Sequence, residues 1–226
     1  MTDDLAALAN FDGQVRLFPL PNLVLFPHVV QGLHIFEPRY RQLMADTLRT
    51  DGTFALALLQ PDWEEDDYDG RPPIEPVACL GRVGWHEKLA DGRYNLRLRG
   101  LSRVRLVEEL PTDRQYRVAR AELIPDVAPA DLARLKRLRK ALAEAVMPHF
   151  ADDAPARRQV EDLFGGDLPL GHVCDILAYG LPLPLEFKQG LLTEPHADLR
   201  AERMTDALKV SAARATRRFP PDFSVN

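Results

Sequence analysis

Side chains that perform nucleophilic and acid–base chemistry are few in this sequence, and they do not cluster. The serines are Ser102, Ser211 and Ser224, and none lies in the Gly-x-Ser-x-Gly turn that presents a nucleophile between a strand and a helix. Cys79 and Cys174 lie among apolar residues, whereas a reactive cysteine needs a base and an electropositive setting. No phosphate-binding loop of the form G-x-x-x-x-G-K-[ST] occurs. The sequence predicts no catalytic residue, and we expect the protein not to be an enzyme.

The residues that could hold a metal ion also lack a suitable spacing. Six histidines are scattered along the chain. His172, Cys174 and Asp175 lie close together, but in an expected helix, where their side chains would diverge. Residues 61–73 form an acidic loop bounded by prolines, and its spacing does not match a calcium-binding loop. We predict no metal site and no cofactor; whether loop 61–73 is ordered or binds a cation stays open.

Arginine is the charged side chain that does form a pattern. Arg97 and Arg99 alternate with leucines on one expected strand, and Arg103 and Arg105 alternate with apolar residues on the next. Residues two apart on a strand share a face, so these side chains would form a basic patch on the outside of a sheet. Such a patch would contact an anion, either an acidic polypeptide or a phosphate backbone. A solvated strand face without a ligand is the alternative.

Three apolar side chains are candidates for contacts with a polypeptide. Leu25 and Phe26 lie in a proline-rich loop, and Trp85 lies in an expected strand with polar neighbours. Together at the surface, they would form an apolar patch of the kind that binds a partner. Core packing is the alternative for each of them, and we favour it for Phe26 and for Phe36.

Composition narrows the class of protein. The chain has 226 residues and a formal net charge of −5, which argues against a general nucleic-acid binder. The first residues are acidic and contain no basic segment of the kind that begins a secretory signal. No apolar run approaches the ~20 residues of a membrane span. The two cysteines are expected to be reduced. We therefore expect a cytoplasmic protein that does not contact a membrane.

The hydrophobic pattern changes once along the chain. Alternation and short apolar runs predict six or seven strands within residues 15–125, with one helix after Pro38. Beyond the linker PDVAP the period becomes that of helices. We expect an α+β fold, with a flexible arm at 1–14, a β-barrel with one inserted helix at 15–125, a helical bundle at 126–216 and an extended tail at 217–226. Closing the sheet into a barrel would remove its exposed edges.

Several short motifs resemble one known family. They are FPL at 18–20, LFP at 25–27, LHIFEPRY at 33–40, GRV at 81–83 and RGLSRVR at 99–105. In combination they resemble the LON substrate-binding domain, the N-terminal module of ATP-dependent Lon proteases. The run at 33–40 is most similar to the stand-alone LON-domain proteins of bacteria. The resemblance covers most of the chain.

The resemblance carries expectations for fold and function. It implies a PUA-like β-barrel followed by helices. It also implies a non-catalytic module that recognises polypeptide substrates, without the ATPase and protease modules of the full-length enzyme. Unfolded polypeptides, a protease or a chaperone would then be its partners. The alternative is a PUA-like module that binds RNA or a nucleotide through the arginines, and the acidic net charge counts against it.

Overall fold

A computed structural model describes residues 2–61, 71–151 and 153–217, and the chain falls into two compact units. One unit comprises Met1–Pro125 with Asp175–Thr193, and the other comprises Asp126–Cys174 with Glu194–Asn226. Between the expected barrel and the expected helical bundle we had placed one boundary, after residue 125. The contacts divide the chain there and twice more, so that a helical segment late in the sequence groups with the strands. The expected tail at 217–226 and most of loop 61–73 lie outside the described residues.

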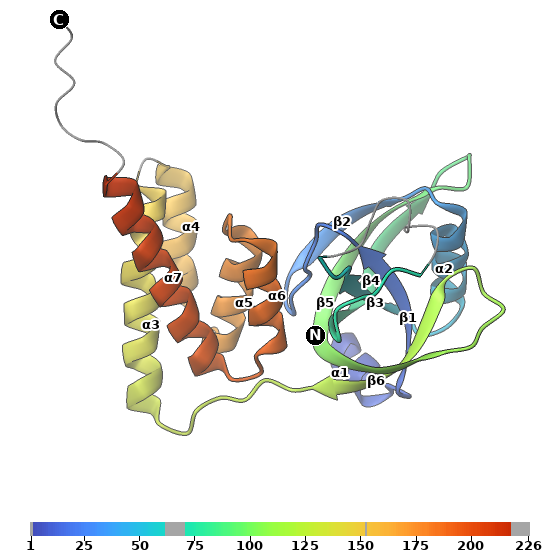
Figure 1. Ribbon diagram of the computed structural model, residues 1–226, viewed down its shortest axis with the longest axis horizontal. Coiled ribbons are helices and arrows are strands. Elements are labelled where there is room, and N and C mark those ends of the chain that lie inside the picture. Colours follow the sequence, from blue (N-terminus) through green and yellow to red (C-terminus); the bar gives the residue numbers. More distant parts are fainter. Residues whose placement is uncertain (1, 62–70, 152, 218–226) are drawn as a thin grey trace, which may run out of the picture. The chain divides into compact units, whose positions relative to one another are not determined.

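Helices and strands follow the order expected from the sequence. The elements are α1 (Thr2–Ala9), β1 (Gln14–Leu20), β2 (Val30–Ile35), α2 (Pro38–Arg49), β3 (Thr53–Leu58), β4 (Val77–Lys88), β5 (Tyr94–Leu110), β6 (Arg117–Ile124), α3 (Leu132–Val146), the 3-10 helix η2 (Met147–Phe150), α4 (Ala154–Gly165), α5 (Leu170–Gly180), α6 (Leu185–Thr193) and α7 (Ala197–Arg217) (Figure 1). The helix α1 occupies most of the segment that we had expected to be a flexible arm. None of the helices described is long and apolar enough to cross a membrane.

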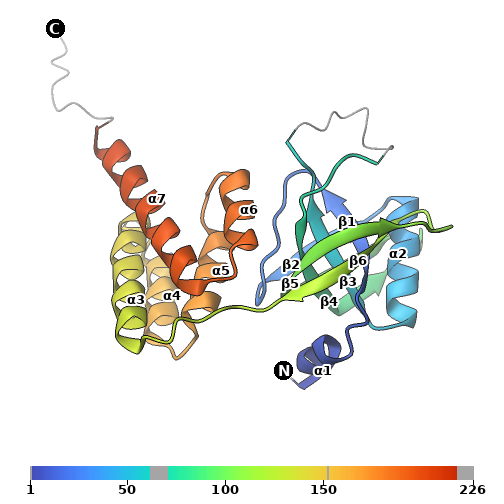
Figure 2. The ribbon, with the colours of Figure 1, turned by 60° about the horizontal axis from the view of Figure 1, so that its bottom comes forward.

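Six strands form one mixed sheet in the order β2-β5-β4-β3-β1-β6 (Figure 2). β1 runs parallel to β3, and the other pairs are antiparallel. β6 also pairs with β5, so the pairings β1–β3–β4–β5–β6–β1 form a cycle, and β2 lies outside it. The length of β5 allows this, because its first part pairs with β2 and its second part with β6.

The two strands expected at 93–98 and 101–106 are a single strand, β5, of 17 residues. Gly100 lies where the two expected strands meet. A Cβ at this position would lie 2.1 Å from the carbonyl oxygen of Phe26, so only glycine lets the loop before β2 approach so closely. Two backbone hydrogen bonds join that loop to Gly100. The Gly100 N–H donates to the Val29 carbonyl, and the His28 N–H donates to the Gly100 carbonyl.

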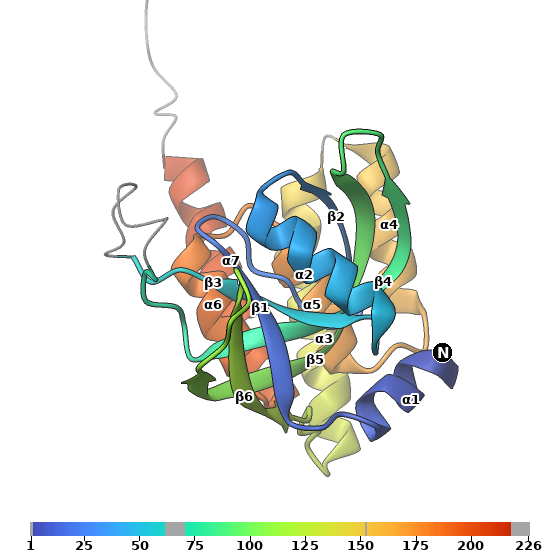
Figure 3. The same cartoon turned by 90° about the vertical axis from the view of Figure 1, so that its right-hand side faces the viewer.

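Small apolar side chains fill the inside of the sheet. The cluster consists of Val15, Leu17, Ala55, Ala57, Ala78, Leu80, Val104, Ala119 and Ala121. Leu8 of α1 packs against it. α2 begins at Pro38, as predicted, and lies along the strands (Figure 3). It buries Tyr40, whose ring meets that of Phe18 edge to face at 4.4 Å.

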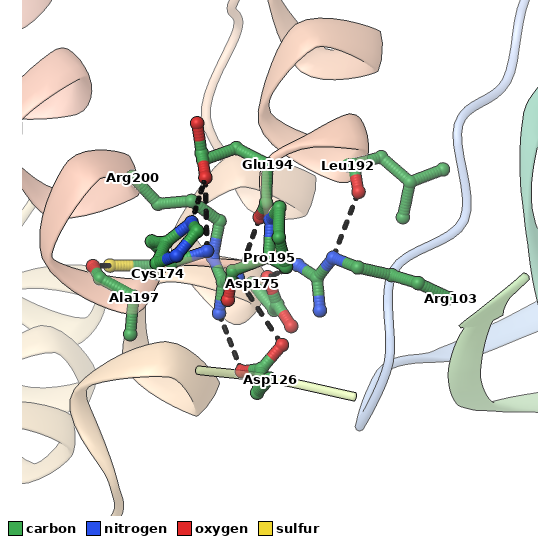
Figure 4. Close-up of polar contacts among 10 residues, drawn as sticks. Arg103, Asp126, Cys174, Asp175, Leu192, Glu194, Pro195, Ala197 and Arg200 are labelled. Atoms are coloured by element: carbon green, nitrogen blue, oxygen red, sulfur yellow. Dashed lines mark hydrogen bonds and ion pairs between the residues drawn. The ribbon is translucent and has the colours of Figure 1, made fainter. Parts of the chain in front are cut away.

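The second unit contains α3, α4 and α7. α3 packs along α7, and Arg134 of α3 forms ion pairs with Asp198 at 2.8 Å and with Glu202 at 3.0 Å (Figure 1). Arg139 donates hydrogen bonds to four carbonyls at the end of α4, from Leu163 to Leu168. Arg200, buried in α7, is held by Asp126 at 2.6 Å (Figure 4). Arginines of this unit therefore stabilise its own helices.

Candidate functional site

Leu25 and Phe26 do not project from their loop. Both side chains are 0% exposed, so neither is available to a partner in this structure. Their loop bonds to β5 at Gly100, and this turns the two side chains into the core. The expectation of two apolar contact residues at the surface therefore does not match their positions, and the alternative of core packing describes both.

The four predicted arginines do not form one patch. Arg103 is 1% exposed and pairs at 2.5 Å with Asp175, which is completely buried in α5 (Figure 4). Its Nε also donates to the Leu192 carbonyl of α6 at 2.9 Å. Arg105 is exposed, but it lies opposite Val77 and Glu122 near the other end of β5. The expected patch is therefore corrected, because α5 and α6 cover the middle of the strand.

The remaining two arginines share a face with Trp85. Residues directly opposite each other on antiparallel strands point to the same side of the sheet. Three rows run across β2, β5 and β4, namely Val30–Arg99–Arg82, Gly32–Arg97–Trp85 and His34–Asn95–Glu87. We call these nine residues the Trp85 face. The face belongs entirely to the first unit of the chain.

A β-bulge brings Trp85 to this face. Arg82 and Trp85 are three residues apart, so simple alternation would place them on opposite sides of the strand. The register shifts between Val83 and Trp85, and Gly84 is the extra residue. The shift returns Trp85 to the side on which Arg82 lies. A single sequence gives no reliable sign of such a shift, so alternation alone does not connect Arg82 with Trp85.

Trp85 and Arg97 form the centre of the face. The guanidinium carbon of Arg97 lies 5.9 Å from the centroid of the Trp85 ring, within the range of a cation–π contact. Trp85 is 50% exposed. Beside them, a Cβ added at Gly32 would have no described atom within 4 Å, so the surface is open there. The pair offers a partner both apolar area and positive charge.

A carboxylate already contacts the first row of the face. Asp4 of α1 lies 3.6 Å from Arg82 and 3.7 Å from Arg99, each measured from carboxylate oxygen to guanidinium nitrogen. Two guanidiniums from neighbouring strands therefore converge on one carboxyl group. Neither Asp4 nor Arg82 was a candidate site residue from the sequence, because their proximity depends on the packing of α1 against β5.

Phe36 extends the apolar area beyond the third row. Its ring stacks on that of His34 at a centroid distance of 6.2 Å, and its side chain is exposed. His34 in turn contacts Asn95 at 2.7 Å between ring nitrogen and amide oxygen. We had favoured core packing for Phe36, and its exposure corrects that expectation. The residue directly follows β2, outside the buried part of the strand.

A separate groove of about 410 Å³ lies between the loop at 22–24 and the segment from Tyr179 to Lys188. Leu23, Leu183 and Leu185 give it apolar walls. Lys188 donates to the carbonyl of Tyr179 at 2.9 Å, and burial lowers the pKa of its ammonium group. Lys188 thus has a structural role at the end of α5.

A larger hollow of about 580 Å³ is lined by charges that already pair with one another. Arg16 contacts Asp51 at 2.9 Å. Burial alone would raise the pKa of Asp51, but hydrogen bonds from Thr53 and the charge of Arg16 lower it below the ordinary value. Within residues 2–61, 71–151 and 153–217, no group of three His, Cys, Asp or Glu side chains could hold a metal ion. The Trp85 face is therefore the strongest candidate for a functional site. Its exposed apolar and cationic side chains suit the binding of a partner.

Comparisons with known proteins agree on one family. The sequence model of one protein family, the ATP-dependent protease La (LON) substrate-binding domain, matches residues 14–210. Lon protease 2 of Myxococcus xanthus is 28% identical over 192 residues, which cover 82% of this chain and 22% of that protein. The chain thus spans less than a quarter of the length of this curated relative.

Two solved structures have a similar fold. The crystal structure of a Lon N-terminal domain protein from Xanthomonas campestris has 26% sequence identity and a TM-score of 0.61, covering 84% of this chain and 96% of that one. The N-terminal domain of a Mycobacterium avium complex Lon protease has a TM-score of 0.65 at 15% identity, covering 87% of this chain and 98% of that one. The second likeness concerns the fold alone.

Proposed function

Because the chain belongs to the LON substrate-binding domain family, we propose that it recognises polypeptides and holds them on the Trp85 face. LON substrate-binding domains bind protein substrates, and the domain itself is a non-catalytic recognition domain. The matched region covers most of this chain but less than a quarter of the Myxococcus protease. The proposal therefore concerns recognition and includes neither ATP hydrolysis nor peptide cleavage.

The exposed pair of Trp85 and Arg97 is the observation that carries this proposal. Tryptophan and arginine are the residues most often found at the energetic centre of protein interfaces. Here they are stacked on a sheet rather than placed on a loop, so little conformational entropy is lost on binding. Val30 and Phe36 add exposed apolar area on either side. An unfolded polypeptide, which exposes both apolar and charged side chains, is a suitable partner.

We interpret the cyclic pairing of β1, β3, β4, β5 and β6 as a closed PUA-like barrel, and the C-terminal helices as a bundle. A protease or a chaperone would act on the polypeptide that the Trp85 face holds. Arg97 and Arg99 are the members of the predicted basic patch that remain available for this role, and Trp85 is the available member of the predicted apolar set.

The test measures binding of an unfolded polypeptide by fluorescence anisotropy. Reduced, carboxymethylated and labelled α-lactalbumin should bind saturably, and Trp85→Ala should weaken binding at least fivefold, as expected for ~1 kcal/mol or more from a central aromatic residue. Val107→Ala is the matched control, because Val107 is 51% exposed on the same sheet, at the far end of β5. Equal affinities of Trp85→Ala and the wild-type protein would refute the placement of the site.

Labelled RNA in a parallel titration tests the alternative function. A PUA-like RNA-binding module would bind through Arg82, Arg97 and Arg99, with an affinity that falls steeply as salt increases. Polypeptide binding that rests on Trp85 should persist at high salt, because apolar contacts are not screened. Binding of RNA alone, with a steep salt dependence, would replace polypeptide recognition by the RNA-binding function.

A further inference from the structure

The contact between Asp4 and the two arginines lies on the Trp85 face and can affect binding there as well as the stability of α1. We propose that Arg82 and Arg99 form a carboxylate-binding subsite of the Trp85 face, and that Asp4 occupies it as an internal competitor of the substrate. The site then prefers polypeptides with an acidic side chain close to an apolar one. This inference rests on the proposed function, because it names the class of polypeptide that the same face selects.

The geometry of Asp4 is the first argument. Its two carboxylate oxygens contact different guanidiniums, one at 3.6 Å from Arg82 and the other at 3.7 Å from Arg99. The arginines come from β4 and β5 and are held opposite each other by the sheet register. Arginine suits this role because its planar group presents several donors to a carboxylate. A fixed pair of guanidiniums is therefore a site for a carboxyl group from any source.

The weakness of the contact is the second argument. Both distances are longer than a charge-assisted hydrogen bond, and Arg99 is more than half exposed. Long, partly exposed pairs of this kind contribute little to stability. α1 has only eight residues, below the length at which an isolated helix is stable. A carboxylate from a bound polypeptide can therefore displace Asp4 at a small cost.

The spacing of the rows defines the preferred sequence. Arg99 and Arg97 are two residues apart on β5, so the carboxylate subsite and Trp85 are about 7 Å apart along the strands. Two residues of an extended polypeptide cover the same distance. An acidic residue and an aromatic or aliphatic residue at positions i and i+2 would thus reach both rows together.

Two forms of one polypeptide test the subsite. α-Lactalbumin is reduced and alkylated either with iodoacetate, which adds a carboxylate at each cysteine, or with iodoacetamide, which adds a neutral amide. We expect the wild-type protein to bind the carboxylate form more tightly. Asp4→Asn should increase the affinity for that form about two- to fivefold, the range set by a surface ion pair, and increase the affinity for the amide form less, because that form carries only its own aspartates and glutamates.

Matched variants separate the subsite from a general charge effect. Asp206→Asn changes the net charge equally from an exposed position on α7, and it should not alter binding. In the background of Arg82→Gln with Arg99→Gln, the effect of Asp4→Asn should disappear together with the preference for carboxylates. Cooperative unfolding in urea, followed by tryptophan fluorescence, shows whether the double variant is folded. If it is not, Arg99→Gln alone replaces it as the background.

The outcomes distinguish this inference from the function on which it rests. Saturable binding of both forms with equal affinity, unchanged by Asp4→Asn, would overturn the subsite and leave polypeptide recognition intact. A gain from Asp4→Asn that persists without Arg82 and Arg99 would also overturn it. Absence of binding of either form to the wild-type protein and to Asp4→Asn would refute polypeptide recognition, and the subsite with it.

Discussion

The ion pair between Arg103 and Asp175 is a buried polar contact of the first unit. The two side chains are 1% and 0% exposed, and they meet at 2.5 Å although they lie 72 residues apart in the sequence. Arg103 also donates to the Leu192 carbonyl. One contact therefore joins β5 to both α5 and α6. We predict that Asp175→Ala strongly destabilises this unit.

The expected size follows from burial. Removing Asp175 leaves the guanidinium of Arg103 away from water without its anion, and breaking a buried pair in this way costs about 3–5 kcal/mol. Replacing both residues with apolar ones of similar volume removes the uncompensated charge. Arg103→Met combined with Asp175→Leu should therefore be more stable than Asp175→Ala alone, by about 2 kcal/mol or more.

Urea unfolding followed by tryptophan fluorescence measures both effects. Trp85 of β4 belongs to the unit formed by residues 1–125 and 175–193, so its fluorescence reports on the unit that contains the ion pair. Glu108→Ala on β5 is the control, because Glu108 pairs with Arg120 at the surface of the same unit. A loss below ~1 kcal/mol in Asp175→Ala, or a double variant less stable than it, would refute the argument from burial.

Three further predictions follow from local geometry. Gly100→Ala should lower the thermal midpoint by several degrees, because the added Cβ would overlap the Phe26 carbonyl. Gly190→Ala is its control: a Cβ at this position in α6 would meet no described atom within 4 Å, so the variant should be more stable than the wild-type protein by ~0.5–1 kcal/mol. Asp51→Asn should cost ~1 kcal/mol at neutral pH, and the difference from the wild-type protein should fade below about pH 4, because a lowered folded-state pKa stabilises only while the carboxylate is ionised. Cys79, whose thiol pKa is raised by burial, should not react with a thiol reagent until the protein unfolds.

Each of these predictions has an outcome that contradicts it. A Gly100→Ala variant as stable as the wild-type protein would mean that the loop can move away from β5. For Asp51, a stability difference that stays constant from neutral to acidic pH would show that its charge does not contribute. Modification of Cys79 at the rate of an exposed thiol would contradict its position in the core.

Much of the fold can be predicted from local patterns in the sequence alone. Pro38 marks the first residue of α2, and the turn at Asp91–Gly92 joins β4 to β5, where Gly92 has the positive φ that such a turn needs. The motifs at 18–40 and 81–105 led to the correct family. These features depend on the period of apolar residues and on backbone preferences within a few positions, so one sequence is enough to recognise them.

Tertiary structure decided which predicted residues are available to a partner. Arg99 and Arg103 look alike in the sequence, yet one lies on an exposed face and the other is buried against an aspartate from a distant helix. A single bulge at Gly84 places Trp85 beside Arg97, and one close approach at Gly100 turns Phe26 into the core. Exposure and pairing depend on segments that are far apart along the chain, and the period of one strand carries no information about what packs against it.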